Sequence, residues 1–428
     1  MAVGITLVLI FAALVVLETP IAAALGISSV VTILAFQVTT FDQIARTVFS
    51  QIDKFTLIAI PLFIIAGTVF SKCGISRRLV KLASLIVGDL RGGLAIVLVV
   101  VSIFFAAISG SGPASVAAIG IIVIPAMVAA GYEGGFTSAL MAAGGGIGII
   151  IPPSIALIIY GVIAEASIEK LFLAGVVPGM LVGIALIGII RMQPETEQMK
   201  AARRRGSLRE IRGAFCDAFF GLLAPLIILG GIYSGIFTAI ESAAVAVVYA
   251  VLVDVVIYRE MSLRELFGVF AEAGSTSAQV LIIVACASLF AYVLHAEGIA
   301  GSVADGLRNL TSNKYVMLLL INVVLIGFGC ILDAISIFYI LLPILLPVVD
   351  ALGIDRVHFG IIMTVNLAIG QVTPPVGVNL FVASSISDVP LARVSRAAIP
   401  IVAAEVVALL FITFIPQLSL FLPGFMRA

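Results

Sequence analysis

Two short stretches rich in glycine and proline interrupt long apolar segments of the chain. They are GGGIGIIIPPS at 144–154 and NLAIGQVTPPVG at 366–377. Proline removes a backbone donor and clashes with the preceding helical turn, while glycine permits backbone angles that a helix does not use. Each stretch therefore breaks a membrane-length helix and frees carbonyl and amide groups that lipid cannot satisfy. Such groups are tolerated against protein or a water-filled cavity, where they can hold an ion or a polar solute.

A polar turn precedes each break in the chain. SGSGP at 109–113 cuts the apolar stretch 92–130, and GFGCILDA at 327–334 lies in the middle of 315–351. Two arms of about 17 residues are at the short end of what spans a bilayer, so we expect a helical hairpin whose tip stops inside the membrane. The sequence thus predicts two re-entrant hairpins, each followed by a broken helix.

Serine hydroxyls and freed carbonyls are hard oxygen ligands that suit a small alkali cation, and broken helices hold such ions in transporters. We therefore predict a sodium site where each tip meets its break. The predicted ligands are Ser109, Gly110, Ser111, Gly146, Ile149 and Pro152 at the first site, and Gly329, Asp333, Gly370, Thr373 and Pro374 at the second.

Other roles are open for some of these residues. The glycines could serve close helix packing, as small residues do in membranes. Asp333 is ionisable and flanked by apolar residues, which is typical of an ion pathway, but it could equally cap the descending arm of its hairpin. The recurrence of a tip and a break together favours the ion sites.

Composition excludes several classes of protein. The chain has 428 residues, of which 62% are hydrophobic and 11% charged, with no net charge. Soluble domains are about 45–50% apolar and about 25% charged, so this is an all-α polytopic membrane protein with no sign of nucleic-acid binding. Four dispersed cysteines and two distant histidines predict no transition-metal site. There is no Walker motif or Ser-His-Asp set, so we expect neither an enzyme nor a cofactor beyond a coupling ion.

Apolar segments fill almost the whole chain, and the hydrophilic stretch 193–215 divides it. We expect an interfacial helix at 41–54 and a basic loop at 72–91. We also expect a second amphipathic stretch at 262–274, a separate span after it at 278–296, and a polar loop at 297–314. Full spans are expected at 3–17, 20–38, 55–71, 170–192, 220–239, 242–258 and 395–415.

The two sides of this divide repeat each other. When the chain is compared with itself at a constant shift of 222 positions, six pairs of glycines or prolines align without a gap. These residues mark turns and helix breaks, so their recurrence indicates an internal repeat. The sequence predicts a first repeat at 1–192, with hairpin 92–130 and broken helix 134–165, and a second at 216–428, with hairpin 315–351 and broken helix 357–387. The aligned pairs are Pro125 and Pro347, Gly131 and Gly353, Gly148 and Gly370, Pro152 and Pro374, Pro153 and Pro375, and Pro178 and Pro400.

Each repeat has five full crossings if its hairpin is re-entrant. An odd number makes the second repeat enter from the opposite side, which is the inverted repeat of secondary transporters. With the 193–215 linker in the cytoplasm and both termini outside, Lys and Arg number sixteen inside and seven outside. This distribution obeys the positive-inside bias.

One known family has a similar tip and similar breaks. The resemblance is seen in the tip SGSGPAS at 109–115, in the first break, and in the second break GQVTPPVGVNLFVAS at 370–384. Over essentially its whole length, the chain resembles the large membrane subunit of TRAP (tripartite ATP-independent periplasmic) transporters. The resemblance implies a bacterial inner-membrane protein that works as an elevator. Its hairpins and broken helices would form a transport domain that moves against a scaffold made by the other helices.

The resemblance also implies partners and a substrate. A small four-helix membrane subunit and a periplasmic binding protein would act with the chain, and sodium would drive import of an organic acid such as a C4-dicarboxylate or a sialic acid. Because the chain starts directly with the large subunit, we expect the small subunit to be a separate protein. The substrate would lie between the two tips, near Ser111, Pro113, Asp333, Thr373 and Asn379.

Neither break contains Lys or Arg, so we expect helix N-termini, hydroxyls and bound sodium to hold the anion. A stand-alone cation-coupled anion carrier of the same repeat design is the alternative, and it would need no binding protein. A channel or structural scaffold is disfavoured, because the proline breaks are costly without a cavity to line.

Overall fold

The computed structural model describes residues 2–311 and 313–426, and these residues form helices and turns with no strand among them. The first half of the chain contains α1 (Ala2–Val16), α2 (Ile21–Phe36), α3 (Phe41–Ile52), η1 (Phe55–Ile58), α4 (Ala59–Lys72), α5 (Ile75–Val87), α6 (Gly93–Ser109), α7 (Gly112–Ala129), α8 (Gly134–Gly146), η2 (Ile147–Ile149), α9 (Ile155–Ala164) and α10 (Ile168–Met192).

The rest of the chain begins with a short linker helix and then follows a similar order. Its elements are α11 (Glu197–Ala201), α12 (Leu208–Tyr233), α13 (Ala239–Leu252), η3 (Val253–Tyr258), α14 (Leu263–Ala296), α15 (Ile299–Leu310), α16 (Lys314–Gly329), α17 (Ala334–Ala351), α18 (Arg356–Gly370), α19 (Val378–Ser387), α20 (Leu391–Phe414), α21 (Gln417–Leu420) and η4 (Pro423–Phe425).

Eight of these helices, among the described residues, are long and apolar enough to cross a membrane, and several shorter helices are equally apolar. Large apolar side chains such as Leu9, Ile121 and Ile184 are more than half exposed on the outer surface of the molecule. Lipid is the solvent that suits such a surface, because water would leave this much apolar area exposed at a large cost. The chain is therefore a multi-pass helical membrane protein, as predicted.

Helix boundaries recur at the shift of 222 positions that the glycines and prolines indicated. The helix α7, Gly112–Ala129, corresponds residue for residue to α17, Ala334–Ala351, and α8 begins at Gly134 where α18 begins at Arg356. Both breaks contain a cis Pro–Pro peptide bond, at Pro152–Pro153 and Pro374–Pro375. The order of elements is thus repeated, while the opposite orientation of the two repeats in a membrane stays a prediction.

The expected basic loop at 72–91 is wrong, because most of it is the helix α5. Ile75, Leu79 and Leu82 are buried along one face, at spacings that suit a helix. Arg77 and Lys81 interrupt the apolar run but lie outside that face, so charge concealed the period. The expected polar loop at 297–314 is likewise largely helical, as α15, and the linker 193–215 contains α11 and the start of α12.

The expected separation of 262–274 from 278–296 is also wrong, because both belong to the single helix α14. The polar residues at the expected boundary satisfy their own hydroxyl groups within the helix. Thr276 Oγ1 donates to the Glu272 carbonyl at 3.1 Å and Ser277 Oγ donates to the Ala273 carbonyl at 2.7 Å. A Ser/Thr hydroxyl that bonds back to the preceding turn leaves the helix continuous.

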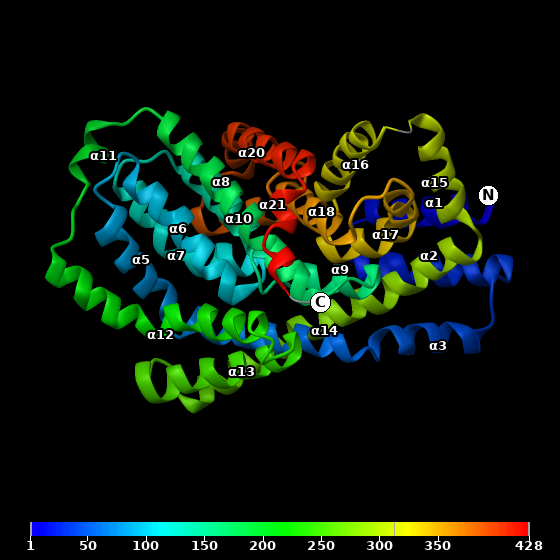
Figure 1. Ribbon diagram of the computed structural model, residues 1–428, viewed down its shortest axis with the longest axis horizontal. Coiled ribbons are helices and arrows are strands. Elements are labelled where there is room, and N and C mark those ends of the chain that lie inside the picture. The colour runs from blue at the N-terminus through cyan, green and yellow to red at the C-terminus, as the bar shows by residue number, and fades with distance from the viewer. Residues whose placement is uncertain (1, 312, 427–428) are drawn as a thin grey trace.

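Two groups of helices pack against each other around the breaks. The helix α14 packs against α2, α3 and α4, and α4 also packs against α13. The hairpin helix α7 and the first arm of the first break, α8, both pack against α19, the second arm of the other break. Figure 1 shows α3, α12, α13 and α14 along the lower edge of the view, with the hairpins and broken helices above them. The two repeats therefore meet at their breaks.

Candidate functional site

The first hairpin tip lies directly on the first break. The Gly110 carbonyl accepts a hydrogen bond from the Ile155 amide, at 3.4 Å, where α9 begins. Gly110 has a φ of +63°, and a Cβ on it would lie 2.6 Å from the Pro153 carbonyl oxygen. Only glycine permits both this backbone angle and this close approach. The tip glycine thus brings the end of α6 against the start of α9.

Hydroxyl groups and carbonyls gather beneath this tip. The Ser109 and Ser115 hydroxyls both donate to the Ser111 carbonyl, at 3.4 Å and 2.8 Å. A Cβ on Gly148, in the break, would lie 2.9 Å from that carbonyl oxygen. Gly148 rather than Gly146 is therefore the break glycine that faces the tip, since a Cβ on Gly146 would lie 3.3 Å from the Ala368 carbonyl of α18.

The second tip meets the second break even more closely. A Cβ on Gly370 would lie 2.5 Å from the Gly329 carbonyl carbon, so the two glycines touch backbone to backbone. The Val376 amide donates to the Cys330 carbonyl at 3.1 Å across the same contact. Thr373 Oγ1 donates to the Ile369 carbonyl at 2.7 Å, which leaves the lone pairs of its oxygen available.

Asp333 caps the second hairpin arm, as the sequence allowed. Its carboxylate accepts from the Ser336 amide at 3.1 Å and from the Ser336 hydroxyl at 2.6 Å, at the start of α17. Ser111, the corresponding residue in the first hairpin, makes no side-chain cap to α7. In the first turn of α7, Pro113 has no amide hydrogen, and the amides of Gly112 and Ala114 have no side-chain cap and can donate to an anion. The start of α17, in contrast, is already served by the Asp333 carboxylate.

Asn379 and Gln371 connect the second break to the first hairpin. Asn379 is fully buried, and its Nδ2 donates to the Ala142 carbonyl of α8 at 3.1 Å. Its Oδ1 and the Gln371 Oε1 are buried without a hydrogen-bond partner. A Cβ on Gly112 would lie 3.1 Å from the Asn379 amide oxygen and close to that of Gln371. Two electron-rich oxygens thus face the tip of the other repeat.

Both tips line one cavity of about 450 Å³. The hairpins form one wall, and α4 and α14 form the other. Three of the five residues predicted at the substrate, Ser111, Pro113 and Asp333, lie in this wall. Further lining residues from the tips and breaks are Ser109, Gly110, Gly112, Ile149, Ile155, Ala334 and Gln371.

The structure does not bring every predicted residue to this cavity. Thr373 and Asn379 are not among its lining residues. The Thr373 hydroxyl bonds back to Ile369, and Asn379 is enclosed between α8 and the first tip. Pro152 is buried within its break, while Pro374 is exposed. These residues surround the meeting points of tips and breaks and do not form one cluster.

Sequence reasoning missed the residues that α4 and α14 contribute. Lys72 and Glu272 line the cavity and form an ion pair across 200 positions of the chain. No local sequence motif contains both residues, because Lys72 lies on α4 and Glu272 on α14, which are far apart in the sequence. Ser154 was also missed, although a serine directly after two prolines is a helix N-cap signal. Its hydroxyl accepts from the Leu157 amide at the start of α9.

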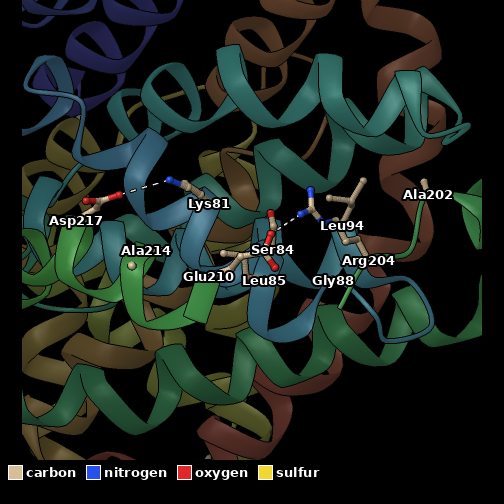
Figure 2. Close-up of a pocket in the computed structure, with 11 residues that line it drawn as sticks. Lys81, Ser84, Leu85, Gly88, Leu94, Ala202, Arg204, Glu210, Ala214 and Asp217 are labelled. Carbon is tan, nitrogen blue, oxygen red and sulfur yellow. Dashed lines mark hydrogen bonds and ion pairs between the residues drawn. The ribbon is translucent and has the colours of Figure 1, made fainter. Parts of the chain in front are cut away.

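A second cavity, of about 570 Å³, lies between α5, the linker and α12. Figure 2 shows two ion pairs in its wall, one between Lys81 and Asp217 and one between Arg204 and Glu210. These charges compensate each other, and neither hairpin tip reaches this cavity. Nothing in its lining corresponds to the predicted ion or substrate residues.

Comparison with known proteins decides the family. A family model described as the DctM component of tripartite ATP-independent periplasmic transporters matches residues 8–418. The chain belongs to this family. As a DctM component it is a large membrane subunit of a TRAP transporter, which confirms the resemblance inferred from the tips and breaks.

Relatives span the same length or more. The chain is 43% identical over 403 residues to the "C4-dicarboxylate TRAP transporter large permease protein DctM" of Pseudomonas aeruginosa, with 94% of each protein covered. It is also 43% identical over 414 residues to the "Isethionate TRAP transporter permease protein DctMQ" of Oleidesulfovibrio alaskensis. That match covers 97% of this chain and 65% of the longer relative.

A solved structure has a similar fold. The YdaH transporter of Alcanivorax borkumensis aligns with a TM-score of 0.63 over 89% of this chain and 88% of that one, at 14% sequence identity. At that identity the likeness concerns the fold alone. The DctM component thus shares its helical architecture with a transporter of very different sequence.

Proposed function

We propose that this DctM component imports an organic acid into a bacterial cell, driven by sodium. It would do so in the inner membrane, together with a small four-helix membrane subunit and a periplasmic binding protein that delivers the substrate. The named substrates of the relatives, a C4-dicarboxylate and isethionate, are small organic anions with a carboxylate or sulfonate group. A sialic acid or a related carboxylate belongs to the same chemical class.

The cavity between the two tips is the observation that carries this proposal. It is bounded by the uncapped start of α7, by the capped start of α17 and by α4 and α14. Helix N-termini attract anions through their free amides and the helix dipole. A carboxylate or sulfonate at the first tip would accept from these amides, while a hydroxyl or second acid group would lie near the second tip.

Sodium would bind at the junctions of tips and breaks. This is supported by the carbonyls and hydroxyls at Ser109, Gly110 and Ser111, by the free lone pairs of Thr373, and by the unpartnered oxygens of Gln371 and Asn379. Neutral oxygens of this kind are hard ligands suited to an alkali ion. Bound sodium would offset the charge of the anion and hold both tips in place.

An elevator motion is the mechanism that we propose for transport. The hairpins and broken helices would move as one body against α4, α13 and α14, and would carry the cavity from one side of the membrane to the other. Contacts of α19 with both α7 and α8 support a single moving body, because they tie the second break to the first hairpin and the first break. The linker would lie in the cytoplasm and both termini in the periplasm.

Reconstituted uptake tests the proposal. Proteoliposomes that contain the chain and its small subunit would be loaded without sodium and given labelled succinate, isethionate or N-acetylneuraminate, each with its binding protein. We expect uptake of one anion that needs an inward sodium gradient and the binding protein. Uptake that needs sodium but no binding protein would favour the stand-alone carrier. Equal uptake with and without a sodium gradient would refute sodium coupling.

A further inference from the structure

An ion pair lines the cavity between the tips. Lys72 is the last residue of α4 and its Nζ contacts the Glu272 carboxylate of α14. Both side chains line the cavity, and both are about half exposed, 46% for Lys72 and 55% for Glu272. The pair therefore connects α4 to α14 in the cavity wall opposite the hairpins, at a place that is accessible to solvent.

The charges along the cavity wall are few and unequal. Lys72 is the single basic residue among the described residues that line it, and Glu272 and Asp333 are the acidic ones. Asp333 is already engaged by the amide and hydroxyl of Ser336. An organic anion in this cavity thus meets one side-chain cation, and Glu272 holds that cation when the cavity is empty of substrate.

Exchange of one anion for another on Lys72 is energetically easy. Exposed ion pairs contribute little net stability, because solvent screens them and two long side chains must be ordered. A lysine ammonium is a compact charge on a flexible stem, so it can turn from one carboxylate to another.

We propose that Lys72 is a specificity-determining residue that binds the acid group of the substrate in exchange for Glu272. Substrate held at the uncapped start of α7 reaches across the cavity to the Lys72 ammonium, and Glu272 recovers Lys72 when the substrate leaves. Lys72 ends α4, and Glu272 lies in the first part of α14. The charge distribution places these parts of both helices toward the cytoplasmic side, so this exchange accompanies release. The inference rests on the proposed import of an organic anion.

Opposite effects of two neutralising substitutions test this role. The complete transporter would be prepared as wild type, Lys72→Gln, Glu272→Gln and the double variant. Binding of the anion that wild type imports, chosen from succinate, isethionate and N-acetylneuraminate, would be measured by ligand-dependent thermal stabilisation. We expect Lys72→Gln to weaken binding by about tenfold, the usual effect of one charged contact. We expect Glu272→Gln to strengthen binding about two- to fivefold, because it removes the competitor.

The double variant and a control separate this role from a structural one. The double variant is expected to bind as weakly as Lys72→Gln, because the competitor matters only when the lysine is present. Lys81→Gln removes a lysine from an exposed pair with Asp217 outside the cavity, and it is expected to bind like wild type. Lys72→Arg, which keeps the charge, is expected to retain most of the affinity.

Three results would overturn the inference in distinguishable ways. Equal weakening by Lys72→Gln and Glu272→Gln would mean that the pair only holds α4 to α14. Unchanged binding in both would mean that the substrate does not reach them. If wild type imports none of the three anions, the proposed substrate class is wrong, and the role of Lys72 is refuted together with it.

Discussion

Gly370 and Gly329 touch backbone to backbone where the second tip meets its break, and this contact has no room for a side chain. We predict that Gly370→Ala separates the tip from the break and lowers sodium-dependent uptake at least tenfold. Overpacking a close contact costs about 1–3 kcal/mol, so the protein should still fold. Uptake in proteoliposomes and thermal stability of the purified chain would measure the two effects.

Gly327 provides the control for this substitution, because it lies in α16 near Gly329, the contact partner of Gly370, and no atom lies within 4 Å of the position of its Cβ. Gly327→Ala should leave uptake unchanged and slightly stabilise the helix, by less than about 1 kcal/mol. If both substitutions have the same small effect, the contact of the second tip with its break is not needed for transport.

Thr373 and Ser111 offer hydroxyl oxygens at the two junctions of tips and breaks. We predict that Thr373→Ala or Ser111→Ala raises the sodium concentration for half-maximal uptake by about three- to tenfold, since one ligand contact contributes about 1 kcal/mol. Thr373→Ser keeps the oxygen and should behave like wild type. Unchanged uptake at low sodium in both alanine variants would remove these residues from the sodium sites.

Helices α9, α17 and α18 are held together by Arg356, a single side chain at the start of α18. Its guanidinium forms two bonds to the Asp350 carboxylate, at 3.0 and 2.7 Å, and donates to the Ala164 carbonyl at 2.9 Å. Tyr160 of α9 donates in turn to the Arg356 carbonyl at 2.6 Å. The second arm of the first break is thus fastened to the first arm of the second break.

We predict that Arg356→Lys loosens this junction although it preserves the charge, because an ammonium cannot replace a bidentate guanidinium. The pair is nearly half exposed, so the expected loss in the free energy of unfolding is modest, about 1 kcal/mol. Thermal unfolding in detergent would measure it, with Arg209→Lys in the linker as a control. A loss no larger than that of the control would show that the apolar packing of Tyr160 and Gly360 holds the junction alone.

The distribution of Lys and Arg along the whole chain predicts how the molecule is oriented in the membrane. In a chain without its four native cysteines, we expect a membrane-impermeant thiol reagent to label Asp53→Cys from the periplasm and Arg205→Cys only after the inner membrane is permeabilised. Both native side chains are exposed, so access to them depends on the side of the membrane. Labelling of both variants from the same side would contradict the three crossings expected between them and hence the inverted arrangement of the repeats.

The helix order of the whole molecule follows from local sequence to a large extent. Residues 109–113 turn the first hairpin where glycine and proline predicted, and both proline pairs end helices at the expected places. The errors also have local causes. The charges of Arg77 and Lys81 concealed the buried face of α5. The polar residues Thr276 and Ser277 lie at the predicted end of a helix, but their hydroxyl groups bond to the preceding turn and α14 continues through them.

Local sequence is enough to predict a membrane protein with two hairpins and two broken helices, because proline, glycine and apolar length act within a single helix. Which side chains face the cavity depends on how the helices pack. Lys72 and Glu272 meet across 200 positions, and Asn379 lies against α8 of the other repeat. Such contacts depend on how whole helices pack, and the packing energy is distributed over many apolar contacts that no short stretch of sequence contains.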